Sequence, residues 1–85
     1  MRQSDEEQAR NQQLLKEIKE AGRKRQEAED KLEAERQRQD KTPVPGKTPE
    51  KRQENTEKRI EILERLEGRL AQQELAYQTT IAALS

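Results

Sequence analysis

A short segment rich in proline and glycine constrains this chain more than any other feature. Residues 41–49, KTPVPGKTP, hold all three prolines and one of the three glycines. Proline cannot continue a helix interior, and it disfavours helical angles at the residue before it. Thr48 followed by Pro49 is typical of an N-cap and the first residue of a helix. The sequence therefore predicts one helix that ends near Asp40 or Lys41 and a second that starts at Pro49.

Both sides of this break consist of good helix formers. The chain is 42% charged and 27% hydrophobic, and its main residue types are Ala, Glu, Lys, Leu, Arg and Gln. We predict a charged amphipathic helix in residues 1–40, a linker in 41–48 and an apolar-striped helix in 49–85. The predicted fold class is therefore all-α. The two helices have matching lengths and a short linker, which favours an antiparallel helical hairpin or coiled coil, and we expect it to be oligomeric.

The first helix has a weak apolar stripe. Ser4 and Glu7 fit a capping box at its start. Gly22 costs helix stability relative to alanine, but the i,i+4 pattern carries through it, so we predict a continuous helix; a helix end at Ala21 is the alternative. The apolar side chains expected to pack within the chain recur at spacings of three, four and seven or more and include Leu14, Ile18 and Leu32.

The second helix carries most of the large apolar side chains. They recur every seven residues, with others at spacings of three and four, which is the pattern of a helix that buries one side. From residue 75 onward the apolar positions widen around the helix, which favours more than one neighbouring helix. The residues predicted to form a protein interface are Ile60, Leu63, Leu66, Leu70, Tyr77, Ile81 and Leu84.

An antiparallel hairpin joined by a loop of this length would set the pairing of the helices. It places Ile18 near Leu70 and Leu32 near Glu57, and it leaves residues 77–84 opposite the polar first turns. The second helix would then keep apolar surface that its own chain does not cover. Helix association is therefore the expected mode of action.

The composition argues against several function classes. The chain has no His and no Cys, so we expect no disulfide, no ordinary zinc site, no cofactor and no catalysis. Its 18 basic and 18 acidic residues cancel, so no overall field attracts a membrane or a nucleic acid. The first residues do not resemble a secretory signal and no run is long enough to span a bilayer, so the default expectation is a cytoplasmic protein.

The leading hypothesis is a non-enzymatic interaction or oligomerisation module that acts through residues 60–84. One alternative is a small adaptor or inhibitor whose helix docks on a partner protein. A second alternative is a nucleic-acid accessory protein that uses the basic patch Arg23, Lys24 and Arg25.

Overall fold

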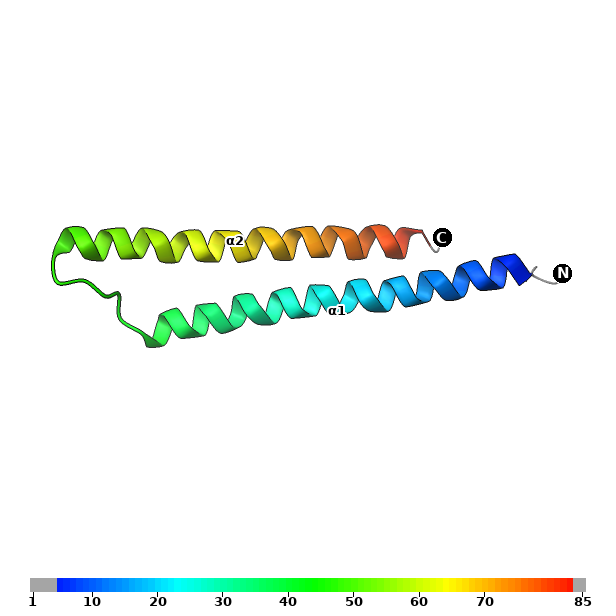
Figure 1. Cartoon of the computed structure of the whole chain (residues 1–85), viewed down its shortest axis with the longest axis horizontal. Helices are drawn as coiled ribbons and strands as arrows, with labels where there is room; N and C mark the ends of the chain where they lie inside the picture. Colours follow the sequence, from blue (N-terminus) through cyan, green and yellow to red (C-terminus); the bar gives the residue numbers. More distant parts are fainter. Residues whose placement is uncertain (1–4, 84–85) are drawn as a thin grey trace.

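The chain forms a hairpin of two long helices, seen in a computed structural model that describes residues 5–83. Helix α1 spans Asp5–Lys41 and helix α2 spans Pro49–Ala82. They run antiparallel along an elongated body of 73 × 17 × 13 Å (Figure 1). This confirms the predicted all-α hairpin. The capping box at Ser4 lies outside the described residues.

The helix ends follow the local sequence. The first turn of α1 is acidic and its last turn contains Arg38 and Lys41, so charges at both ends complement the helix dipole. The helix continues through Gly22 without a break. At the start of α2, the Thr48 hydroxyl accepts a hydrogen bond from the Lys51 backbone N–H at 3.2 Å, as predicted for an N-cap followed by proline.

The linker folds back along the first turns of α2. Gly46 has a φ of +146°, in a region that side chains disfavour, and a Cβ there would lie 2.8 Å from the Arg52 backbone nitrogen. The Asn55 side chain donates to the Pro45 carbonyl at 2.6 Å. After α1 ends, the linker runs alongside the first turns of α2 to reach the start of that helix. The end of α1 therefore packs beside the third turn of α2, at Arg59, and not beside its first turn.

Arg59 fixes this arrangement at the end of α1. Its guanidinium donates to the carbonyl oxygens of Gln39 at 3.2 Å, Thr42 at 2.7 Å and Pro43 at 3.0 Å. In return, the Gln39 side-chain amide donates to the Arg59 carbonyl at 3.2 Å. A helix C-terminus leaves carbonyls without partners and carries partial negative charge. The Arg59 guanidinium provides hydrogen bonds to these carbonyls and a positive charge near the helix end. It also holds the two helices in one register.

The pairing of the two helices differs from the pairing predicted from the sequence. Leu32 shares a groove with Leu70, whereas the sequence pairing placed it near Glu57 and placed Ile18 near Leu70. That pairing was wrong by roughly three helical turns. The physical reason is the path of the linker, which lets α2 extend past the end of α1, while the first turns of α1 extend past the end of α2 (Figure 1).

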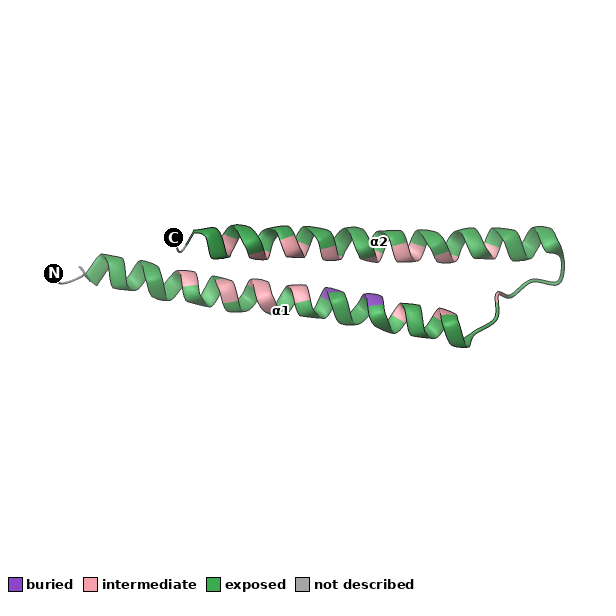
Figure 2. Ribbon diagram, turned by 180° about the vertical axis from the view of Figure 1, so that it is seen from behind, coloured by how far each residue is buried: buried purple, intermediate pink, exposed green. Residues whose placement is uncertain are grey.

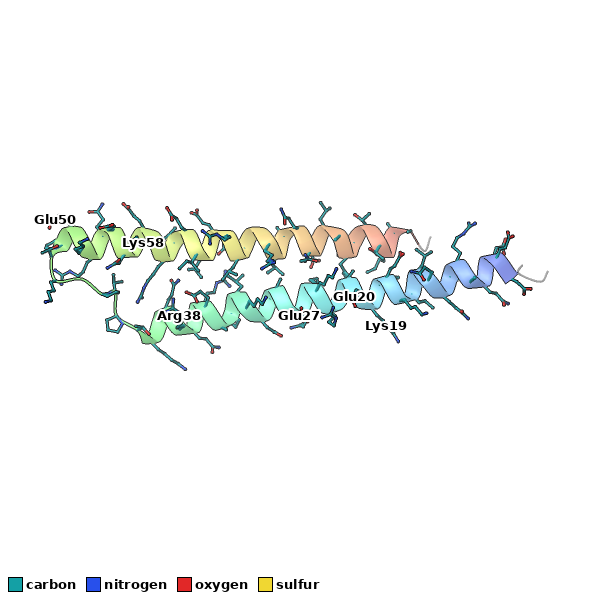
Figure 3. The ribbon with its side chains drawn as sticks, viewed as in Figure 1. Lys19, Glu20, Glu27, Arg38, Glu50 and Lys58 are labelled. Atoms are coloured by element: carbon teal, nitrogen blue, oxygen red, sulfur yellow. The ribbon has the colours of Figure 1, made fainter. Side chains whose placement is uncertain are left out.

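The facing sides of the two helices form the seam of the hairpin. Only Ala28 and Leu32 are buried among residues 5–83, at 6% and 5% exposure, and half-buried residues continue along the same sides (Figure 2). Charged side chains cover the outer surfaces, and Lys19 is one that extends away from α2 (Figure 3). On α1, the seam positions follow a seven-residue repeat: Leu14, Ile18, Ala21, Arg25, Ala28, Leu32, Glu35 and Gln39.

Candidate interaction surfaces

The structure divides the apolar residues of α2 between two environments. Leu63, Leu66, Leu70 and Tyr77 are half-buried on the side that faces α1. Ile60, Leu75 and Ile81 are 49%, 69% and 38% exposed. We call these three residues the exposed apolar residues of α2; they lie 15 and 6 positions apart and do not share one helix face. Leu84, also predicted for the interface, lies outside the described residues.

The three residues predicted to hold the first helix in place also differ. Leu32 is buried, while Leu14 and Ile18 are half-buried. Leu32 has apolar neighbours on α2, since it lines a groove with Leu70 and Ala71. The packing between the helices is therefore strongest in the middle of the hairpin.

Tyr77 packs closely against α1. A Cβ added to Gly22 would lie 3.3 Å from the Tyr77 ring, so the glycine permits this close approach. The Arg25 guanidinium carbon lies 5.5 Å from the ring centroid, within the range of a cation–π contact. The glycine that weakens α1 locally thus sits where α2 presents its one aromatic side chain.

Opposite charges meet along one side of the seam, which we call the paired flank. Arg25 pairs with Glu74 at 3.0 Å and Arg36 pairs with Glu67 at 3.1 Å, each joining α1 to α2. Hydrogen bonds from Gln78 and the nearby Arg25 charge lower the pKa of Glu74 below 4.5. This flank therefore contains electrostatic attraction between the helices.

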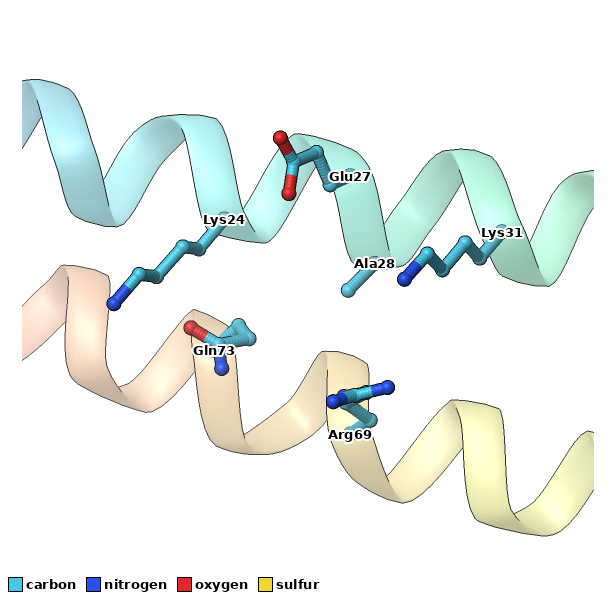
Figure 4. A pocket seen from close by; sticks show the side chains of 6 residues that line it. All are labelled: Lys24, Glu27, Ala28, Lys31, Arg69 and Gln73. Carbon is cyan, nitrogen blue, oxygen red and sulfur yellow. The ribbon is translucent and has the colours of Figure 1, made fainter.

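The other side of the seam contains a cationic groove of about 310 Å³. Its cationic side chains come from both helices; Lys24 extends from α1 toward α2, whereas the Glu27 carboxylate points away from α2 (Figure 4). Glu27 forms an ion pair with Arg23 instead. The lining residues are Lys24, Glu27, Ala28, Lys31, Arg69 and Gln73.

The basic patch predicted from sequence does not form one continuous cationic surface. Arg23 pairs with Glu20 and Glu27, and Glu20 raises the pKa of Arg23 while its own pKa falls. Arg25 belongs to the paired flank. Only Lys24 of the three has no ion-pair partner within residues 5–83, and it joins the cationic groove. Sequence reasoning missed this groove, although Lys24 and Lys31 share one helix face at a spacing of seven.

The strongest pKa shift lies at the linker end of the seam. Hydrogen bonds from Arg38 and Gln39 lower the pKa of Glu35 from 4.5 to about 2. These contacts hold a carboxylate in place beside the α1 terminus. All three residues belong to α1, so these contacts support the last turns of that helix, and they do not by themselves indicate acid–base chemistry.

Comparisons with known proteins give no family and no relative from which a function could be inferred. No protein-family model, curated protein or solved structure matches the chain. Within the described part, no cluster of three carboxylates could hold a metal ion. No helix in residues 5–83 has the length and apolar character needed to cross a membrane.

Proposed function

We propose that the hairpin is a non-enzymatic module that associates with a second copy of itself through the exposed apolar residues of α2. The observation that carries the proposal is Leu75, which is 69% exposed although it is among the largest apolar side chains of α2. Ile60 and Ile81 are also exposed, on adjoining sides of the same helix. Burying such side chains yields roughly 1.5–3 kcal/mol each, which favours association.

The total surface supports the same proposal. The hairpin exposes 7123 Å², whereas a folded monomer of this mass exposes about 5,200 Å² by the usual scaling. A chain with two buried residues in the described range gains little from its own core. A second hairpin placed against α2 reduces the excess surface and forms a four-helix arrangement.

Mass in solution, measured by light scattering after size exclusion, tests this proposal together with circular dichroism over a dilution series. We expect a dimer or larger assembly whose helicity falls on dilution. Leu75→Glu should produce monomers at concentrations where the wild type is assembled. The control Ala34→Glu adds the same charge at an exposed position on the far side of α1 from Leu32 and should leave the mass unchanged.

Two outcomes argue against self-association. A monomer with high, concentration-independent helicity contradicts any need for a partner. A monomer with little helicity instead favours the adaptor alternative, in which the helix folds on a different protein.

A further inference from the structure

Three exposed cations line the cationic groove. Lys31 and Arg69 come from opposite helices and line the same groove. Lys24 lies two helical turns before Lys31, roughly 10 Å along α1. None of the three forms an ion pair within residues 5–83. The one carboxylate in the groove, Glu27, is engaged by Arg23.

Like charges that line one groove repel each other, and solvent screens part of the repulsion between exposed side chains such as these. Residues that oppose the fold in this way are typical of functional sites, where a ligand supplies the missing interaction. An anion in the groove would turn the repulsion of three cations into attraction. The groove is partly open, so such a ligand can enter from solvent.

We propose that the cationic groove binds a compact oligophosphate, a ligand with two or three phosphate groups. Arg69 offers a planar guanidinium that matches phosphate oxygens, and the two lysines offer point charges. The roughly 10 Å between Lys24 and Lys31 along the helix accommodates more than one phosphate group. Gln73 adds an amide that can donate a hydrogen bond.

The lining of the groove favours a compact ligand over a nucleic-acid strand. Towards the linker, the nearest cations of α1 already have acidic partners, since Arg36 pairs with Glu67 and Arg38 pairs with Glu35. A nucleic-acid strand needs a continuous track of free cations and commonly uses aromatic stacking as well, and no aromatic residue lines this groove.

Calorimetric titration with tripolyphosphate tests the proposal. The groove variant replaces Lys24, Lys31 and Arg69 with glutamine. The matched control replaces Arg10, Lys16 and Lys19, which are exposed and form no ion pair in the described chain, so its net charge changes equally. We expect at least tenfold weaker binding in the groove variant and less than twofold change in the control. Equal losses in both variants, or no loss in either, would overturn the site.

Three further arms identify the ligand class. Inorganic phosphate should bind at least tenfold more weakly than tripolyphosphate, since it meets fewer cations. A single-stranded oligothymidylate that binds when tripolyphosphate does not would overturn the compact-ligand proposal. An oligoglutamate peptide that binds as tightly as tripolyphosphate would overturn the assignment to phosphate.

Thermal unfolding provides a readout that does not depend on the triple variant folding well. Tripolyphosphate should raise the melting temperature of the wild type, because it binds the folded hairpin. The single variant Lys31→Gln removes one exposed charge and should reduce that rise by at least half. An unchanged rise in Lys31→Gln contradicts the site even if the triple variant is poorly folded.

Discussion

The two sides of the seam use the same helices but opposite electrostatics. On the paired flank, Arg25 meets Glu74 and Arg36 meets Glu67. The cationic groove is lined by Lys31 of α1 and Arg69 of α2, and neither forms an ion pair within residues 5–83. An antiparallel hairpin brings equivalent repeat positions of its two helices together, so each side attracts or repels according to its own residues. The net charge of zero is therefore an average over two surfaces, one with paired opposite charges and one with positive charges that are unpaired within the described chain.

Leu32→Ala should have the largest effect, because Leu32 is buried beneath the paired flank. We expect a loss of about 2–4 kcal/mol in the free energy of unfolding, from lost burial and the cavity that remains. Urea unfolding followed by circular dichroism measures it. A large loss in the free energy of unfolding would show that the apolar contact around Leu32 holds together both sides of the seam.

The control for that variant is Leu15→Ala, the same change at a side chain that is 53% exposed. Its expected cost is below about 0.5 kcal/mol. Equal costs for the two variants would show that the hairpin seam does not stabilise the chain.

Reversing one charge on each flank should shift stability in opposite directions. Glu67→Lys places like charges opposite Arg36 and should lower the free energy of unfolding by about 0.5 kcal/mol. Lys31→Glu places a carboxylate near Arg69 and should raise it by a similar amount, about 0.5 kcal/mol. Urea titrations at low salt measure both changes.

A second substitution and added salt serve as controls for these two variants. Adding Arg36→Glu to Glu67→Lys should restore the wild-type stability, and 1 M salt should shrink every difference because it screens exposed charges. If Lys31→Glu destabilises the hairpin at low salt, the contrast between the flanks is wrong.

Acid should weaken the contacts that the carboxylates of the hairpin form. The folded-state pKa of Glu35 is about 2 and that of Glu74 is lowered. Both lie below the ordinary 4.5, so their contributions are present above pH 4.5 and are lost as pH falls toward 2. We expect the melting temperature to fall over this range. Circular dichroism melts at half-unit steps measure the decline.

Two glutamine substitutions separate this effect from the general build-up of positive charge. Glu35→Gln should make the decline shallower, because it removes the most strongly shifted carboxyl. Glu61→Gln, at an exposed residue that forms no ion pair among residues 5–83, should leave the slope unchanged. A flat acid profile in the wild type would contradict the role of these carboxylates.

Much of the fold follows from local sequence. Prolines 43, 45 and 49 with Thr48 predicted the break and the second start, and the seven-residue spacing predicted the facing sides. The predicted interface was harder to assign, because a stripe such as Leu63, Leu70 and Tyr77 does not state which helix covers it. In the structure α1 covers these residues in part, and Ile60, Leu75 and Ile81 stay exposed.

The sequence by itself determined two helices, their boundaries and their amphipathic sides, because helix propensity, proline geometry and apolar period act over a few neighbouring residues. Only the tertiary structure decided the register, through the Arg59 side chain and the folded-back linker. That register decides which charges face each other. The paired flank depends on contacts between residues 31 and 49 positions apart, and no local sequence pattern specifies which residues so far apart will face each other.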